Sequence, residues 1–289
     1  FVANFRPEEF SFEKCWINLL QTIENRDDVD IHLIMDGDID HSFMSKYKDK
    51  FTLHLIKAGS DQKSFNKTWE IAKSIKTEDD DIYYFLENDY LHVDYWVDFI
   101  KGIYSFREEK LMHYVSLYDH MDKYIMKMYS NLTSSVKFVQ YEDNNIRYER
   151  HWRSTPSTCG SFCVSKQLFE EDYDVQTTFS GDHEKFLYLN KEKNRGVFTP
   201  IPSLSTHCVN YLLAPAVNWN YYNSSYNTAS NGDYNIYMGQ AATLKKGSVQ
   251  NSSFADGFVF ASKQGWSDGS GGDRTLMGQV NMYGIPKTG

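Results

Sequence analysis

Residues 81–92 read DIYYFLENDYLH, an apolar and aromatic run that ends abruptly at Glu87 and Asp89, which flank Asn88. Such a run, without polar alternation, predicts a strand buried on both faces, as in parallel sheets. Ligands of open α/β sheets gather at the carboxyl ends of such strands. Two carboxylates at that position can bind Mg²⁺ or Mn²⁺ through oxygen. The stretch therefore predicts a cation or phosphate-ligand site, with a polar loop after a core strand as the alternative.

The chain before this stretch alternates predicted strands and helices. Apolar residues recur at helical spacing from Phe12 to Ile23, with Ser11 as a candidate N-cap. The order of these short units predicts an α/β fold with a mostly parallel central sheet, flanked by helices and joined by right-handed crossovers. The other predicted elements here are strands over 1–5, 30–35 and 51–56 and a helix over 64–75.

The chain after it continues in the same way. Two polar segments are predicted to be loops: 119–122, which resembles a metal site in composition but not in spacing, and 147–153, which mixes cations with aromatic residues. The second of these could neutralise a diphosphate, line an acceptor groove or form a solvated surface. The predicted elements are helices over 95–106 and from about 179, strands over 112–117, 137–141 and 158–165, and a late strand over 197–202.

The composition shifts at residue 217 to Asn, Ser, Gly and Tyr. Residues 217–289 hold five Lys or Arg and four Asp, so residues 1–216 hold 25 basic and 35 acidic residues and carry a net charge of −10. Short β-like stretches alternate there with Gly-rich turns. We expect a catalytic α/β unit over residues 1–216 and a β/loop-rich C-terminal extension over 217–289.

Charge and cysteine usage limit the partners and the compartment. A net charge of −9 argues against nucleic-acid binding, and no apolar run reaches the length of a transmembrane segment. Cys159 and Cys163 fall in one predicted strand, where four residues span roughly 13 Å, too far for a disulfide. Cys15 and Cys208 are isolated in sequence. These features predict a reducing, cytoplasmic location, while four Asn-x-Ser/Thr sequons leave a lumenal one open.

A second predicted strand also ends in carboxylates, at Asp36 and Asp38, which flank Gly37. A carboxylate there can accept hydrogen bonds from the base or the ribose of a nucleotide. The alternative is a tight turn, because Asp-Gly is a common turn dipeptide. Two acidic strand ends about fifty residues apart, separated by a helical crossover, favour the nucleotide site.

The motif Glu87-Asn88-Asp89 resembles the Asp-x-Asp signature of nucleotide-sugar-dependent glycosyltransferases with the GT-A fold, of the family 2 type. In that family the last carboxylate binds the metal that bridges the donor's diphosphate. This chain departs at the first position, where Glu replaces Asp and is expected to bind sugar hydroxyls or a metal-bound water. The resemblance covers residues 1–216 and rests on five motifs in order: Asp36-Gly37-Asp38, Glu87-Asn88-Asp89, Gly160-Ser161, Asp182-His183-Glu184 and His207.

The resemblance implies a role for each motif. Asp182, with Glu184 as the fallback, is the general base of an inverting transfer, although an ordinary helix capped by Ser180 or Asp182 explains the same residues. His207, after a late strand, joins Asp89 in binding Mn²⁺ or Mg²⁺. The implied donor-binding residues are Arg6, Asp36, Asp38, Asn66, Glu87, Asn88, Asp89, Gly160 and Ser161.

The resemblance thus predicts a metal-dependent enzyme that moves a sugar from a UDP- or GDP-linked donor to a glycan or another hydroxyl acceptor. A sugar nucleotidyltransferase is one alternative, but it would carry a Gly-rich basic loop where this chain has Arg6-Pro7-Glu8-Glu9. A non-catalytic carbohydrate-binding protein is the other, suggested by the aromatic tail. Residues 219–226 are expected either to bind the acceptor or to brace the catalytic unit.

Overall fold

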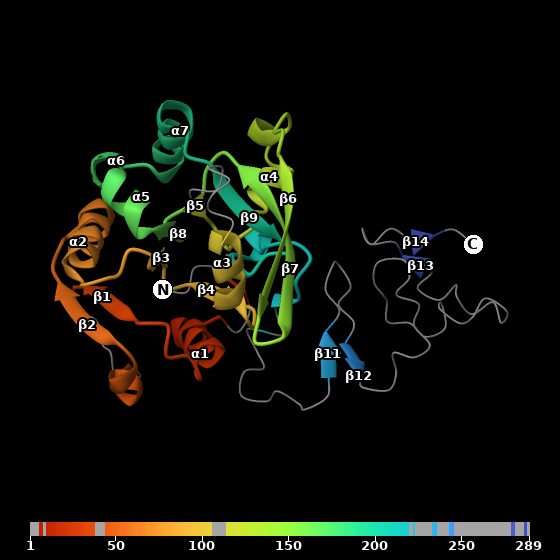
Figure 1. Ribbon diagram of the computed structural model, residues 1–289, viewed down its shortest axis with the longest axis horizontal. Helices are drawn as coiled ribbons and strands as arrows, with labels where there is room; N and C mark the ends of the chain where they lie inside the picture. Colours follow the sequence, from red (N-terminus) through yellow and green to blue (C-terminus); the bar gives the residue numbers. More distant parts are fainter. Residues whose placement is uncertain are drawn as a thin grey trace.

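The computed structural model describes residues 6–7, 10–37, 44–105, 114–219 and 222, and the short segments 233–235, 243–245, 279–280 and 286–287. These residues form an α/β fold (Figure 1). The strand predicted over residues 1–5 lies outside them, as does Asp38. The α-helices are α1 (Phe12–Thr22), α2 (Asp61–Ser74), α3 (Trp96–Ser105), α4 (Asp122–Ile125), α5 (Lys166–Glu171), α6 (Tyr173–Thr178) and α7 (Asp182–Lys193). The 3₁₀ helices are η1 (Met44–Lys50), η3 (Lys127–Tyr129) and η4 (Asn210–Leu212).

Six strands form the central sheet, in the order β3–β8–β5–β9–β7–β6. Their bounds are β3 (Ile82–Phe85), β5 (Tyr114–Val115), β6 (Val136–Asp143), β7 (Ile146–Thr155), β8 (Phe162–Ser165) and β9 (Val197–Ile201). Two-stranded pairs join β1 (His32–Asp36) to β2 (Thr52–Ile56), and β4 (Tyr90–His92) to β10 (Ser205–His207). Two further pairs join β11 (Asp233–Asn235) to β12 (Thr243–Lys245), and β13 (Gln279–Val280) to β14 (Pro286–Lys287).

The expectation of a mostly parallel central sheet is not confirmed. Within the six described strands, only β5 and β9 pair in parallel, while the other four pairings are antiparallel. Strand β8 lies between β3 and β5 and is antiparallel to both. Burial on both faces of a strand was interpreted as a sign of parallel neighbours. In this chain, helices cover both faces of strands that pair in antiparallel fashion, so two-sided burial does not indicate strand direction.

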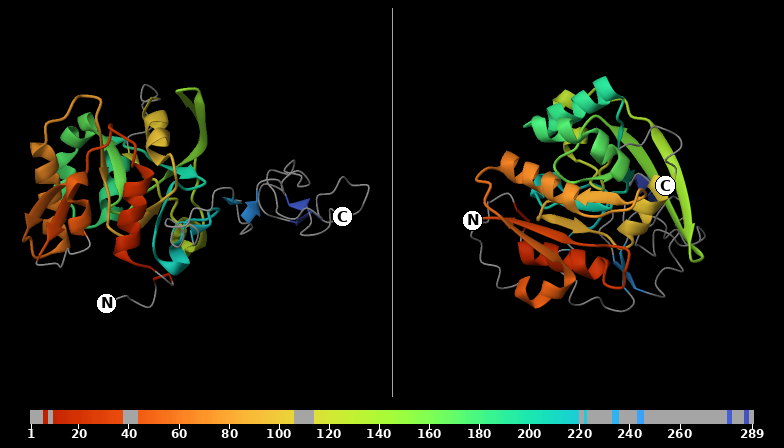
Figure 2. Two further views of the ribbon diagram at one scale, coloured as in Figure 1. Left: turned by 90° about the horizontal axis from the view of Figure 1, so that it is seen from below. Right: turned by 60° about the vertical axis from the view of Figure 1, so that its left-hand side comes forward.

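Two apolar cores cover the two faces of the sheet. Along β8, Phe162 and Val164 enter one core and Cys163 enters the other, and β3 and β5 alternate in the same way. Helices α2, α5 and α7 contribute to the first core, and α1 and α3 to the second (Figure 1; Figure 2). The predicted two-sided burial of residues 82–86 is therefore confirmed.

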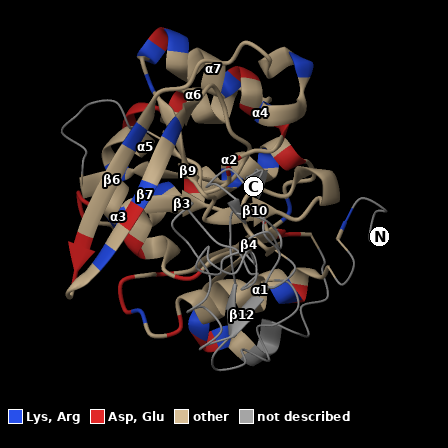
Figure 3. Cartoon of the chain, turned by 90° about the vertical axis from the view of Figure 1, so that its right-hand side faces the viewer, with Lys and Arg blue, Asp and Glu red and all other residues tan. Residues whose placement is uncertain are grey.

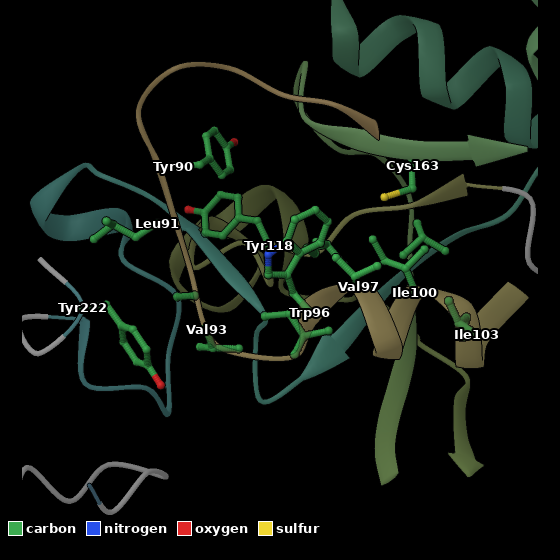
Figure 4. Close-up of a cluster of buried hydrophobic side chains, with 14 of the residues drawn as sticks. Tyr90, Leu91, Val93, Trp96, Val97, Ile100, Ile103, Tyr118, Cys163 and Tyr222 are labelled. Atoms are coloured by element: carbon green, nitrogen blue, oxygen red, sulfur yellow. The ribbon is translucent and has the colours of Figure 1, made fainter. Parts of the chain in front are cut away.

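The first core is built on Trp69 of α2, which is fully buried. Its ring stacks on Phe85 of β3 and on Phe169 of α5, in each case with centroids 4.6 Å apart. In the second core, Tyr90 and Leu91 of β4 lie near Tyr118 and Trp96 (Figure 4). Strand β4 is therefore held inside the protein immediately after the acidic motif.

The N-terminal unit forms as its local signals predict. Ser11 caps α1 by accepting a hydrogen bond from the amide of Lys14 at 3.1 Å. The same helix packs Trp16 against Met35 of β1, which is the parallel partner of β2. A second capping residue, Ser60, starts α2 three residues earlier than predicted.

The segment 147–153, predicted to be a loop, is the middle of strand β7. Tyr148 and Trp152 are buried, while Arg147, Glu149 and His151, at the alternate positions, are exposed. Figure 3 shows charged positions along β6 and β7, which pair as a long antiparallel ribbon. The period-two alternation of a half-buried strand was present in the sequence, but the density of charge concealed it.

Residues just past 216 belong to the packing of the preceding unit. Trp219 and Tyr222 are both 3% exposed and join the second core, and the Trp219 indole donates to the carbonyl of Ala214 at 2.8 Å. These two rings therefore brace the fold instead of presenting a recognition surface. Most of 217–289 lies outside the described residues. In the described part of the chain, no helix has the length and apolarity needed to cross a membrane.

Helix α1 is fastened to β4 by one buried side chain. Asn18 of α1 is fully buried, and its amide makes two bonds to the main chain of His92. The Asn18 oxygen accepts from His92 N–H at 2.7 Å, and the Asn18 nitrogen donates to His92 C=O at 3.0 Å. This clamp fixes the strand that directly follows the acidic motif.

Replacing Asn18→Ala should lower the free energy of unfolding by about 2–4 kcal/mol, because two buried main-chain groups lose their partner. Urea denaturation followed by circular dichroism measures this change. Asn190→Ala, on the exposed face of α7, is the matched control and should cost less than about 1 kcal/mol. Equal losses in the two variants would show that the clamp contributes nothing specific.

Candidate functional site

The site is organised by the pairing of β4 with β10. Asp89 directly precedes β4, and His207 is the last residue of β10, opposite Tyr90 in the antiparallel register. The carbonyl of Asp89 accepts a hydrogen bond from the amide of Cys208 at 3.0 Å. The ring of His207 stacks on Tyr90 with centroids 5.3 Å apart. Strand pairing therefore brings together a carboxylate and an imidazole that are 118 positions apart.

Asp89 is 7% exposed and carries two basic partners on one oxygen. Its Oδ2 lies 2.9 Å from His207 Nε2 and 2.7 Å from Arg6 Nη1. Burial alone would raise the pKa of Asp89, but the hydrogen bonds and charges of His207 and Arg6 outweigh burial and hold this pKa below its usual value. Asp89 is therefore a stable anion inside the protein.

Arg6 is anchored to the same segment that carries His207. Its Nη1 donates to the carbonyl of Cys208 at 2.9 Å, and its own carbonyl accepts from Asn210 Nδ2 at 2.8 Å. The guanidinium also lies over the ring of Phe10, 4.8 Å from the centroid. The N-terminal segment thus supplies a cation at a defined place beside Asp89.

Glu87 is held by the Gly-Ser segment that precedes β8. Ser161 Oγ accepts from the Glu87 amide and donates to Glu87 Oε2, both at 3.0 Å. Gly160 leaves the room for this contact, since a Cβ there would lie 3.2 Å from Glu87 Cδ. Because Phe85 pairs with Phe162, the end of β3 meets the start of β8 at one edge of the sheet.

The electrostatic environment of Glu87 includes the other carboxylates. Its pKa is raised, first by withdrawal of the carboxylate from water and then by the negative charge of Asp89, with a smaller contribution from Asp182. The residue as a whole is exposed, so this withdrawal is local to the carboxylate, which lies against Gly160 and Ser161. Asp182 therefore shares one electrostatic environment with the acidic motif.

Asp182 is the first residue of α7, and the N-cap is Gly181, not Ser180 or Asp182. Its Oδ1 lies 3.4 Å from the ammonium of Lys185, which is 1% exposed. That ammonium also lies 3.9 Å from the centroid of the Phe65 ring. The position of Asp182 is therefore set by a buried cation one helical turn further along.

Glu184 takes a different direction from Asp182. A Cβ added to Gly181 would collide with the Glu184 carboxylate, so this side chain folds back over the start of α7. An acid at the third helical position is well placed to complement the exposed amides of a helix N-terminus. The two acidic side chains therefore point in different directions, and Asp182 is the one that contacts Lys185.

The remaining predicted donor residues are held elsewhere. Asp36 accepts from the amide of Ala58 at 2.8 Å, which links the ends of β1 and β2. Asn66 of α2 donates to the carbonyl of Thr177 at 3.0 Å. Asn88 is exposed in the turn between β3 and β4, and Asp38 lies outside the described residues. The described contacts of Asp36 and Asn66 are to the main chain and to neighbouring side chains, not to the Asp89 group.

Residues 119–121 form a loop, as predicted, and Asp122 begins α4. Asp119 is 1% exposed, and its Oδ1 accepts from Arg153 Nε and Nη2 at 2.9 and 2.6 Å. Its Oδ2 accepts from the hydroxyl of Tyr124 at 2.7 Å. Asp119 therefore serves a buried ion pair between the loop and β7.

Asp89 and His207 offer two ligands for a divalent cation. In the described part of the chain, no group of three or more His, Cys, Asp or Glu side chains is arranged to hold a metal ion. Asp89 Oδ1, however, is buried and has no hydrogen-bond partner among the described residues. A carboxylate oxygen with an imidazole nitrogen suits Mn²⁺. The residues fit a two-ligand site whose other ligands come from water and a bound phosphate group.

Two residues of this site were missed by sequence reasoning. Tyr90 forms the ring platform under His207, and Asn210 holds the main chain of Arg6. Tyr90 follows Asp89 directly, so its proximity was predictable, but its stacking depends on the partner strand. No local signal identifies Asn210.

Comparison with known proteins adds no assignment: no family model matches the chain, and no curated protein matches its sequence.

Arg6, which is bonded to Asp89 Oδ2, and a divalent cation would compete for the negative charge of the Asp89 carboxylate. Arg6→Gln should therefore tighten the binding of Mn²⁺ alone by about fivefold to tenfold, a change of about 1–1.4 kcal/mol. Isothermal titration calorimetry with MnCl₂ measures this affinity. Arg147→Gln, which removes an exposed cation from β7, should leave it unchanged. Unchanged or weaker Mn²⁺ binding in Arg6→Gln would exclude the competition.

Proposed function

We propose that this chain is a metal-dependent glycosyltransferase with a GT-A-type catalytic unit, which moves a sugar from a nucleotide-diphospho sugar to a hydroxyl acceptor. The observation that supports it most is the convergence of separate sequence regions on one turn. Asp89 and His207 are joined by a hydrogen bond, Glu87 is bonded to Ser161, and the charge of Asp182 contributes to the raised pKa of Glu87. Each of these residues was a candidate in the sequence, and they lie in four separate regions of it.

Asp89 and His207 would hold the cation and present it to the donor's diphosphate. When bound, a divalent cation stabilises the negative charge that develops on a leaving diphosphate. Arg6 lies on the same carboxylate and would bring a second positive charge to the phosphates. The geometry therefore concentrates positive charge where the leaving group would sit.

Glu87 and the Gly160-Ser161 segment would form the sugar side of the site. Gly160 has no side chain, and Ser161 orients one oxygen of Glu87, which leaves that carboxylate able to accept hydrogen bonds from sugar hydroxyls. Burial of the carboxylate and the negative charge of Asp89 both raise the pKa of Glu87. These residues would orient the donor sugar without taking part in proton transfer.

Asp182 would accept the proton of the acceptor hydroxyl. In an inverting transfer, the acceptor oxygen bonds to the anomeric carbon, the bond from that carbon to the diphosphate oxygen breaks, and the proton passes to the base. Lys185 Nζ lies 3.4 Å from Asp182 Oδ1 and so helps to orient that carboxylate. The nucleoside diphosphate then leaves with the electron pair of the broken bond.

A cytoplasmic, reducing location is part of this proposal. All four cysteines are unpaired thiols in the described structure, which is the state expected in such a compartment.

Calorimetry with UDP and GDP, with and without Mn²⁺, tests the proposed function directly. Metal-dependent binding of one nucleotide is the expected result. A carbohydrate-binding protein would bind glycans but neither nucleotide. A sugar nucleotidyltransferase would turn over a nucleoside triphosphate with a sugar phosphate. Absence of nucleotide binding under both metal conditions would overturn the proposal.

Asp89→Asn and His207→Ala should each weaken the Mn²⁺-dependent affinity for the preferred nucleoside diphosphate by about tenfold or more, at least about 1.4 kcal/mol. Each removes one of the two protein ligands. Asp174→Asn and His151→Ala are exposed controls of the same chemistry and should bind as the unaltered chain does. Full activity in EDTA would contradict the role of the metal.

Asp182→Asn should reduce turnover by about 10²–10⁴ while donor affinity survives, because the lost carboxylate acts on the acceptor proton. Glu184→Gln is the matched control and should retain most turnover, since its side chain folds back over Gly181. Transfer assays measure both effects, and NMR of the product reads its anomeric configuration. Retention of the donor's configuration would remove the need for this base.

A further inference from the structure

Two cysteines that are isolated in sequence meet in the second core. Cys15 of α1 and Cys208, one residue past β10, have their sulfur atoms 3.9 Å apart. The two residues are 3% and 1% exposed. Contact between thiols separated by 193 positions is not predictable from spacing, and it places two buried thiols beside the candidate site.

Both cysteines belong to segments that are attached to strand β4. Cys15 lies three residues before Asn18, whose amide makes two bonds to the main chain of His92 in β4. Cys208 follows β10, which pairs with β4, and its amide donates to the carbonyl of Asp89. Because both segments are attached to β4, the native fold holds the two sulfur atoms close to each other. The native fold thus gives the pair a high effective concentration.

We propose that Cys15 and Cys208 form an intramolecular disulfide when the protein meets a disulfide oxidant such as oxidised glutathione. A disulfide needs a sulfur–sulfur distance of about 2.05 Å, so the two atoms must approach by roughly 1.9 Å from their present contact. The bond ties α1 to the segment that carries His207. This inference does not depend on the proposed function.

The chemistry balances with one molecule of oxidised glutathione. One cysteine sulfur attacks the oxidant and releases the first glutathione thiol, and the second cysteine sulfur then displaces the other. The two protein thiols are oxidised to one disulfide, and one glutathione disulfide is reduced to two thiols. The two protons of the protein thiols end on the released glutathione.

The bond has a consequence for the site as well as for stability. The carbonyl of Cys208 accepts from the Arg6 side chain, and its amide donates to the main-chain carbonyl of Asp89, so the cross-linked residue helps to position both of these residues. A tether over so long a loop also removes much conformational freedom from the unfolded chain. Oxidation therefore makes the region around Asp89 and His207 harder to open.

The test treats the full chain with oxidised glutathione, blocks the remaining thiols after unfolding, and maps the peptides without reduction. Two of the four thiols should disappear, and one cross-linked pair containing Cys15 and Cys208 should be recovered. The melting temperature should rise on the order of 5–10 °C and return on reduction.

Matched variants assign the bond to the pair. Cys163→Ser alters a buried cysteine of β8 and should leave the cross-link intact, whereas Cys15→Ala and Cys208→Ala should each abolish it together with the rise in melting temperature. Peptide mapping of the unaltered chain decides the matter even where a variant folds poorly. Four free thiols after oxidation, or a bond involving Cys159 or Cys163, would overturn the proposal.

Discussion

The pairing of β4 with β10 is the constraint on which the rest of the site depends. It sets His207 opposite Tyr90 and so beside Asp89, and it aligns the amide of Cys208 with the carbonyl of Asp89. Asn18 in turn fastens β4 to α1 by bonding both the main-chain N–H and the C=O of His92. A main-chain ladder is a good frame for such a site, because its hydrogen bonds fix register and direction together.

Charge balance explains how this frame tolerates a buried carboxylate. Removing Asp89 from water is costly unless basic groups approach it closely, and His207 and Arg6 both do so at hydrogen-bond distance. Buried ion pairs are weak evidence for stability, since apolar residues of similar volume are often as good. Clustered groups with shifted pKa values are more typical of sites with chemistry to perform. The shifted pKa values of Asp89 and Glu87, which lie two residues apart, therefore support the proposal of a ligand site at this turn.

Local sequence signals predicted many of the elements and misjudged how some are arranged. The caps at Ser11 and the aromatic run before Glu87 formed as expected, because both depend on neighbours in the chain. Two-sided burial of β3 was also correct, but the inference of parallel neighbours was wrong, since antiparallel β8 provides the same burial. The strand over 147–153 was missed because its charged face outweighed the alternation of Tyr148 and Trp152.

By itself, the sequence determined helices α1, α2, α3 and the start of α7, several strands, and the placement of Glu87 and Asp89 just after strand β3, but not the short helices α4, α5 and α6. It also provided the candidates His207, Ser161 and Asp182, but not their contacts. Only the tertiary structure decided that His207 and Arg6 share one oxygen of Asp89, that Asp182 and Glu184 diverge, and that Cys15 meets Cys208. The reason is physical: helix caps and hydrophobic periodicity act over a few residues, whereas ladder partners and strand direction depend on contacts between residues more than a hundred positions apart.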